Sequence, residues 1–167
     1  MTQRRQERKG RCNPVWLTVI AGGFLALQGA PAAAQATTER VVVNRSTGLA
    51  IDGYDPVAFF AESKPLAGRA EFEAVHDGAI WRFRNEGNRA AFLAHPEIYQ
   101  PQFGGYDPVD VGRGVPVEGR PSVWAVVNQR LFLFSSGASR TDFTNNPGGS
   151  VTRAKLRWSE LRSTLAE

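Results

Sequence analysis

The dipeptide Asp77-Gly78 stands between two segments in which apolar and polar residues alternate. Asp-Gly is a preferred sequence for the two-residue turn of a β-hairpin, because both turn positions need a positive φ angle. The pairs expected across the hairpin are Phe72 with Phe83, Ala74 with Trp81, Glu73 with Arg82, and Glu71 with Arg84. The first two pairs are apolar and predict a core face, while the last two are oppositely charged and predict a solvent face.

A second hairpin is predicted where residues 123–127 return through Asn128-Gln129 as residues 130–134. Both of its faces are apolar. One face carries Trp124, Val126, Leu131 and Leu133, and the other carries Val123, Ala125, Phe132 and Phe134. A strand pair with two apolar faces is expected to lie centrally in the fold, or to cover a ligand or partner surface.

Capping residues predict short helices around these hairpins. The expected helices are Pro56 to Phe60 after Asp55, Glu86 to Ala94 after Asn85, a turn from Pro96 through Tyr99, and Val151 to Leu165 after Ser150. The last helix has an apolar stripe that is expected to dock on the sheet. The sequence thus predicts an α+β fold: a small single domain with two β-hairpins forming an antiparallel sheet, short helices and a C-terminal amphipathic helix.

The pentapeptide Gly-Tyr-Asp-Pro-Val occurs twice, at 53–57 and at 105–109. The residues that flank the two occurrences differ, and five residues are a short match. On these grounds the sequence predicts no internal repeat.

The N-terminus has the layout of a cleaved signal peptide. Arg4, Arg5, Arg8, Lys9 and Arg11 precede an apolar stretch from Val15 to about Leu27, and small residues follow at 32–36. We expect residues 1–36 to be removed, with Thr37 as the first mature residue and no stable membrane span afterwards. The mature protein is then expected in the periplasm or secreted, with a flexible lead-in at 37–48 and a folded domain at 49–167.

Removal of this segment changes the charge of the chain. The formal charge of +4 comes wholly from residues 1–36, so the remainder carries equal numbers of basic and acidic residues. A balanced, interspersed charge argues against a nucleic-acid partner. The single cysteine, Cys12, is lost as well, which leaves the mature domain without a disulfide or a thiolate metal ligand.

Several separated aromatics, glycines and prolines occur in a recognisable order. They are Asp55-Pro56-Val57, Gly78, Trp81, Phe83, Phe92, Pro96-Glu97-Ile98-Tyr99 and Gly104-Gly105-Tyr106. The pattern resembles the YHS domain, and most closely its secreted, signal-peptide-bearing branch. The resemblance implies a small module often linked to metal handling. The family cysteines are missing, since Ala58, Arg84, Asn88 and Asp107 stand in their places.

Candidate site residues follow from side-chain chemistry. Aromatic walls with polar tips are typical of small-ligand pockets, and the candidates for such a pocket are Tyr54, Asp55, Tyr99, Phe103, Tyr106 and Asp107. Only His76 and His95 can supply imidazole to a metal, and with carboxylate oxygens they would suit Cu or Zn. A structural role for each histidine is the simpler interpretation.

The sequence therefore favours a non-enzymatic, exported YHS-like protein that binds a small ligand, a metal ion or an envelope protein. No nucleophile elbow or zinc-protease motif is present. Two alternatives stay open at this point. One is an enzyme using Asp55, His76 and Asp107, and the other is an interaction module whose two-faced hairpin and C-terminal helix form a dimer interface.

Overall fold

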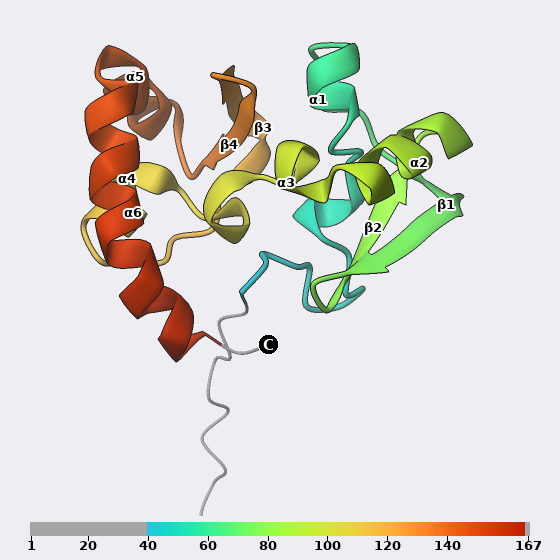
Figure 1. Ribbon diagram of the computed structural model, residues 1–167, viewed down its shortest axis with the longest axis horizontal. Coiled ribbons are helices and arrows are strands. Elements are labelled where there is room, and N and C mark those ends of the chain that lie inside the picture. The colour runs from blue at the N-terminus through green and yellow to red at the C-terminus, as the bar shows by residue number, and fades with distance from the viewer. Residues whose placement is uncertain (1–39, 166–167) are drawn as a thin grey trace, which may run out of the picture. The chain divides into compact units, whose positions relative to one another are not determined.

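The computed structural model describes residues 40–165. The expected signal peptide, with Cys12 and the expected cleavage point, lies outside the described residues. The elements come in two series (Figure 1). The first is η1 Ile51–Gly53, α1 Ala58–Ala61, β1 Arg69–His76, β2 Ala79–Phe83, α2 Glu86–Ala94 and α3 Pro96–Tyr99; the second is η2 Gln102–Gly105, α4 Pro108–Gly112, β3 Arg120–Val127, β4 Arg130–Phe134, α5 Gly137–Asn145 and α6 Pro147–Thr164.

The two series are two copies of one structural module: a first copy at 49–100 and a second copy at 101–165. Each runs from a 3₁₀ turn and a short helix through a hairpin to two further helices. The expectation of no repeat was wrong. The identical residues are scattered between dissimilar ones, and the clearest pairs beyond the pentapeptide are Gly68 with Gly119, Phe83 with Phe134, Phe92 with Phe143, and Pro96 with Pro147.

Backbone hydrogen bonds repeat between the copies. The amide of Asp55 donates to Leu66 O at 2.8 Å, and that of Asp107 donates to Val117 O at 2.8 Å. The amide of Gly68 donates to Gly53 O, and Gly119 donates to Gly105 O in the same way. The copies therefore share a backbone path, and the pentapeptide lies near the start of each.

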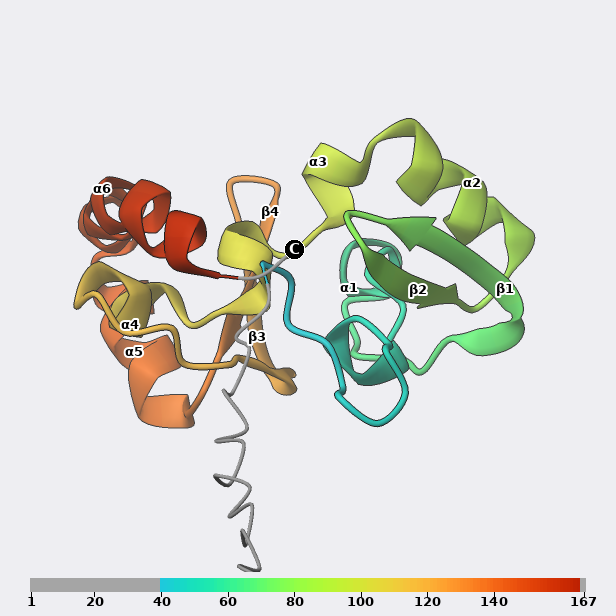
Figure 2. The same cartoon turned by 90° about the horizontal axis from the view of Figure 1, so that it is seen from below.

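The predicted class is confirmed, since the fold is α+β with two antiparallel hairpins, short helices and a long C-terminal helix. The hairpins do not join into one sheet. Each is a separate two-stranded sheet, β1 with β2 and β3 with β4, as Figure 2 shows from below. Strands of a two-stranded sheet rely on packing for their stability, so the cores that cover them matter more than their ladders.

The predicted register of the first hairpin holds only near its turn. Glu73 lies opposite Arg82 and Ala74 opposite Trp81, but an irregularity beyond Glu73 puts Arg69 opposite Phe83. The predicted pairs of Phe72 with Phe83 and Glu71 with Arg84 were therefore wrong. The second hairpin has an equivalent irregularity between Arg120 and Trp124, so the shift belongs to the module.

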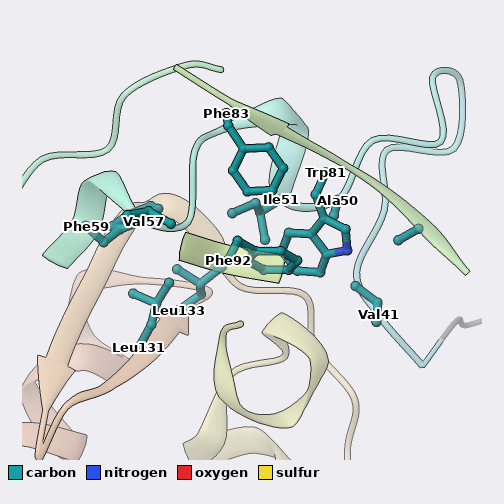
Figure 3. Close-up of a cluster of buried hydrophobic side chains, with 11 residues drawn as sticks. Val41, Ala50, Ile51, Val57, Phe59, Trp81, Phe83, Phe92, Leu131 and Leu133 are labelled. Atoms are coloured by element: carbon teal, nitrogen blue, oxygen red, sulfur yellow. The ribbon is translucent and has the colours of Figure 1, made fainter. Parts of the chain in front are cut away.

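The second hairpin is central, as its two apolar faces predicted. On one face, Leu131 and Leu133 are fully buried in a core with Trp81, Phe83 and Phe92 of the first copy (Figure 3). On the other face, Phe132 and Phe134 belong to a second core. That core includes Phe143, Ala154 and Leu165, with Trp158 packed against it. One β-hairpin thus separates two cores and belongs to both.

The C-terminal helix is longer than expected. It begins at Pro147, and its N-cap is Asn146, whose side chain accepts a hydrogen bond from Gly149 N at 3.0 Å. The predicted cap at Ser150 was wrong. Helices α4 and α5 were not predicted, although each has its counterpart in the first copy. In both views α6 lies beside α4, and no helix of residues 40–165 is long and apolar enough to cross a membrane.

The packed part of the chain begins before Leu49. Val41 and Val42 are each 8% exposed and take part in the first and second core respectively. Val42 N also donates to Gly104 O at 2.8 Å. Residues 41–42 therefore belong to the fold and not to the expected lead-in.

Candidate ligand-binding site

Asp55 and Asp107, predicted as ligand-binding residues, are both fully buried and lie at equivalent places in the two copies. Asp55 Oδ1 accepts from Val57 N at 2.8 Å, and its Oδ2 accepts from Arg84 N at 2.8 Å and from Asn88 Nδ2 at 2.6 Å. Each carboxylate thus joins the start of a short helix to the end of a hairpin.

Asp107 repeats this scheme with hydroxyl donors. Its Oδ1 accepts from Val109 N at 2.9 Å and from Ser139 Oγ at 2.7 Å. Its Oδ2 accepts from the backbone amide and the hydroxyl of Ser135, both at 2.8 Å. The oxygens of both carboxylates are occupied by the protein itself, so the geometry assigns these residues to the framework.

The predicted aromatic residues do not gather in one pocket. Tyr54 pairs with Ala67 through an isolated bridge, and Tyr99 packs edge-on against Phe60 with ring centroids 5.3 Å apart. Tyr106 is 2% exposed and packs against Trp158. Phe103 alone among the six lines the groove described below.

The two histidines lie in different surroundings. The His76 ring stands edge-on to buried Phe92, and its Nε2 is 3.6 Å from Asp77 Oδ2. His95 caps α2, is largely exposed, and has Nδ1 3.5 Å from Glu97 Oε1. Within residues 40–165, no three His, Cys, Asp or Glu side chains come together in a group suited to hold a metal.

The arginines around the first hairpin are paired. Arg82 Nε lies 2.7 Å from Glu73 Oε1, Arg84 Nε lies 3.7 Å from Glu62 Oε1, and Arg89 Nη2 lies 2.9 Å from Glu86 Oε1. The hydrogen bond from Glu86 raises the pKa of Arg89, and its charge adds to the effect. These exposed pairs complete a charged surface and leave no cluster of unpaired cations there.

A groove with a volume of about 750 Å³ lies where the two copies join, and we call it the basic groove. Its volume is in the range typical of small-molecule sites. The first copy contributes Asp77, Gly78, Ala79, Trp81, Glu97 and Gln100. The second copy contributes Pro101, Gln102, Phe103, Gly104, Arg130, Lys155, Trp158 and Arg162. Arg40 and Val41 complete the lining.

The walls of the basic groove combine aromatic rings with polar groups. Phe103 packs edge-on against Trp158 with centroids 5.9 Å apart, and Trp81, whose indole N–H donates to His76 O at 3.0 Å, also lines the groove. Phe103 holds a left-handed backbone at φ 55°, which is unusual for a bulky residue. Its counterpart in the first copy, Ile51, has φ 44°, so this strained turn is a property of the module and not of the groove.

The sequence reasoning missed the residues of the basic groove other than Phe103. A signal was nevertheless present on the C-terminal helix, where Lys155 and Arg162 stand three residues before and four residues after Trp158. Residues at those spacings share one face of a helix. Trp158 lies in the apolar stripe of the helix, and Lys155 and Arg162 add a cation on either side of it along the sequence.

A scan against protein-family models, and searches of curated proteins and of solved structures, find no match to this chain. The resemblance to the YHS domain therefore depends on the motif residues alone.

Proposed function

We propose that this chain is an exported, non-enzymatic YHS-like protein that binds a small organic ligand in the basic groove. The order of its motif residues and the signal-peptide layout support the family and a periplasmic or secreted location. The observation that carries the binding role is the groove itself. It has an aromatic wall at Phe103 and Trp158, polar groups from both copies, and a volume suited to a small molecule.

Two features weigh against the enzymatic alternative. A general base must be able to accept a proton from a substrate, and a nucleophile must be able to reach one. Asp55 and Asp107 are fully buried, and their oxygens accept hydrogen bonds from backbone and side-chain donors of the framework. An enzyme that used Asp55, His76 and Asp107 would first have to break the hydrogen bonds that these two carboxylates accept within each copy.

The dimer alternative is weakened by the central hairpin. Its two apolar faces were the reason to expect a partner surface, and both are covered within the chain. A metal-binding role has less support than an organic ligand, because His76 and His95 each approach a single carboxylate.

The proposed function can be tested with a fragment library that contains neutral, cationic and anionic compounds. Amide resonances of the exported protein would be followed by NMR, and native mass spectrometry of protein purified from the periplasm would reveal a retained ligand. We expect hits to shift Gly78 and Gly104, which line the groove from different copies. A library without hits, or hits that cluster around Tyr54 or His95 instead, would contradict the proposal.

A further inference from the structure

One face of α6 presents a basic, an aromatic and a second basic residue to the groove. Lys155, Trp158 and Arg162 all line it, and their spacing of three and four residues places them in one row along the helix. With a rise of about 1.5 Å per residue, the Cα atoms of Lys155 and Arg162 are about 10 Å apart along the helix axis. Trp158 stands between the two basic residues in this row.

These two cations differ from the paired arginines around the first hairpin. Within the described range 40–165, neither Lys155 nor Arg162 has an ion-pair partner. Arg157 belongs to the same helix but does not line the groove, and its Nη1 lies 3.8 Å from Glu160 Oε2. Arg153, also on α6, has no ion pair either, but its Nη2 donates to Ser150 Oγ at 3.2 Å and it does not line the groove. In residues 40–165, Lys155 and Arg162 thus line the groove with neither an ion pair nor a side-chain hydrogen bond.

Arg130 contributes a third cation, from the start of β4. Its Nη1 donates to Glu97 O at 2.7 Å, which holds the guanidinium at the groove. In residues 40–165 this backbone oxygen is its only hydrogen-bond partner, and no carboxylate neutralises it. A guanidinium held in this way presents its remaining N–H donors to a carboxylate or phosphate oxygen.

The acidic groups of the groove are already engaged. Asp77 Oδ2 accepts a hydrogen bond from Gln100 Nε2 at 3.4 Å and lies near His76, while Glu97 lies near His95. Neither carboxylate approaches the three cations closely enough to form an ion pair. The groove therefore has an excess of unpaired positive charge on both sides of an aromatic surface.

We infer that the ligand of the basic groove is an elongated aromatic dianion, with one anionic group near Lys155, the other near Arg162, and its ring against Trp158. This inference rests on the proposed function and adds the chemical class of the ligand. Arg130 supplies a further donor to whichever anionic end lies beside it. Two separated charges and a flat body match the row on α6 better than a compact anion would.

The test compares three rigid probes by isothermal titration calorimetry with the purified exported protein. They are biphenyl-4,4′-dicarboxylate, the monoanion biphenyl-4-carboxylate and the neutral diol biphenyl-4,4′-dimethanol. We expect the dianion to bind about tenfold more tightly than the monoanion, as one further charge-assisted hydrogen bond would give. Its affinity should fall as the salt concentration rises, because exposed charges are screened.

Variants locate the binding on α6. We expect Lys155→Gln and Arg162→Gln each to lower the affinity for the dianion about tenfold and to leave the affinity of the diol unchanged. Trp158→Leu should lower the affinity for all three probes. Because Trp158 also packs on Phe103, thermal unfolding of this variant would be recorded to check that it is folded. Arg157→Gln is the matched control on the same helix and should bind like the unaltered protein.

The outcomes separate this inference from the proposed function. The inference is overturned if the dianion does not bind or binds no better than the diol. It is also overturned if Lys155→Gln and Arg162→Gln leave the affinity for the dianion unchanged. Fragment hits at Gly78 and Gly104 would still uphold the proposed function in that case. If no compound of any charge binds the groove, the proposed function and this inference are both wrong.

Discussion

The two copies share a backbone path but use it differently. In the first copy, Glu73 and Arg82 face each other as a partly exposed ion pair on the outer side of the hairpin. Their counterparts in the second copy are Trp124 and Leu133, which face the core formed with the first copy. One module thus provides a solvent face and a buried interface from equivalent positions, so the side chains decide which surface is covered.

The copies differ most in their last helix. The first copy ends with α3, which has 4 residues, whereas the second ends with α6, which has 18. Both helices begin with a proline at an equivalent position, Pro96 and Pro147. Lys155, Trp158 and Arg162 all lie in the part of α6 that extends beyond the length of α3. The framework is common to the copies, and the extension adds the basic and aromatic row of α6 to the lining of the basic groove.

The largest effect is expected from separating the copies. A fragment of residues 40–100 lacks Leu131 and Leu133, which close the core around Phe92. An isolated two-stranded sheet of this size is at most marginally stable, so we expect the fragment to be unfolded. Circular dichroism and proton NMR would measure this. A dispersed, cooperative spectrum from the fragment alone would show that the copies are independent.

Next in size is the loss of either buried carboxylate. Asp55→Ala and Asp107→Ala each leave several donors without an acceptor, so each is expected to lower the free energy of unfolding by about 3 kcal/mol. Urea denaturation would measure both, with exposed Asp142→Ala as the control. Equal losses would support one shared role, and a negligible loss at Asp107 alone would break the equivalence of the two copies.

Arg82 and Leu133 occupy equivalent hairpin positions, and a comparable loss of unfolding free energy is expected only at Leu133. Leu133→Ala should cost about 2 to 4 kcal/mol, because it opens a cavity in the core shared by the copies. Arg82→Ala should cost less than about 1 kcal/mol, because its ion pair with Glu73 is partly exposed. Both would be measured by urea denaturation. Similar costs at the two positions would contradict the assignment of buried and solvent faces.

A smaller, symmetric effect is expected at Gly68 and Gly119. A Cβ atom at Gly68 would lie 2.5 Å from Arg82 Cβ, and one at Gly119 would lie 2.6 Å from Leu133 Cβ. Alanine at either position should cost about 1 to 3 kcal/mol through overpacking. Gly148→Ala is the control, since nothing lies within 4 Å of its added Cβ, and thermal unfolding would compare the three.

Local signals predicted most of the elements. The Asp77-Gly78 turn, the cap at Asn85 and the two-faced hairpin all depend on neighbours in sequence, and the structure confirms them. The shifted pairing of Arg69 with Phe83 was not predictable in this way, because the ladder is irregular between Arg69 and Glu73. Strict alternation around a turn assumes that no residue is inserted into the ladder.

The candidate site was predicted poorly for a related reason. Asp55 and Asp107 looked like candidates because carboxylates beside aromatics are common in binding sites. Their partners, Asn88 and Ser139, lie far along the chain and become neighbours only in the fold. The groove residues come from both copies, so their proximity follows from how the copies pack. Of the groove, the sequence offered Phe103 as a candidate and the spacing of basic residues around Trp158.

The copies are joined almost without a linker, since α3 ends at Tyr99 and η2 begins at Gln102. The residues at this junction, Gln100 to Gly104, also line the basic groove. A lone module has no such junction and no second copy to face it. A groove of this composition therefore needs both copies in one chain and the longer last helix of the second.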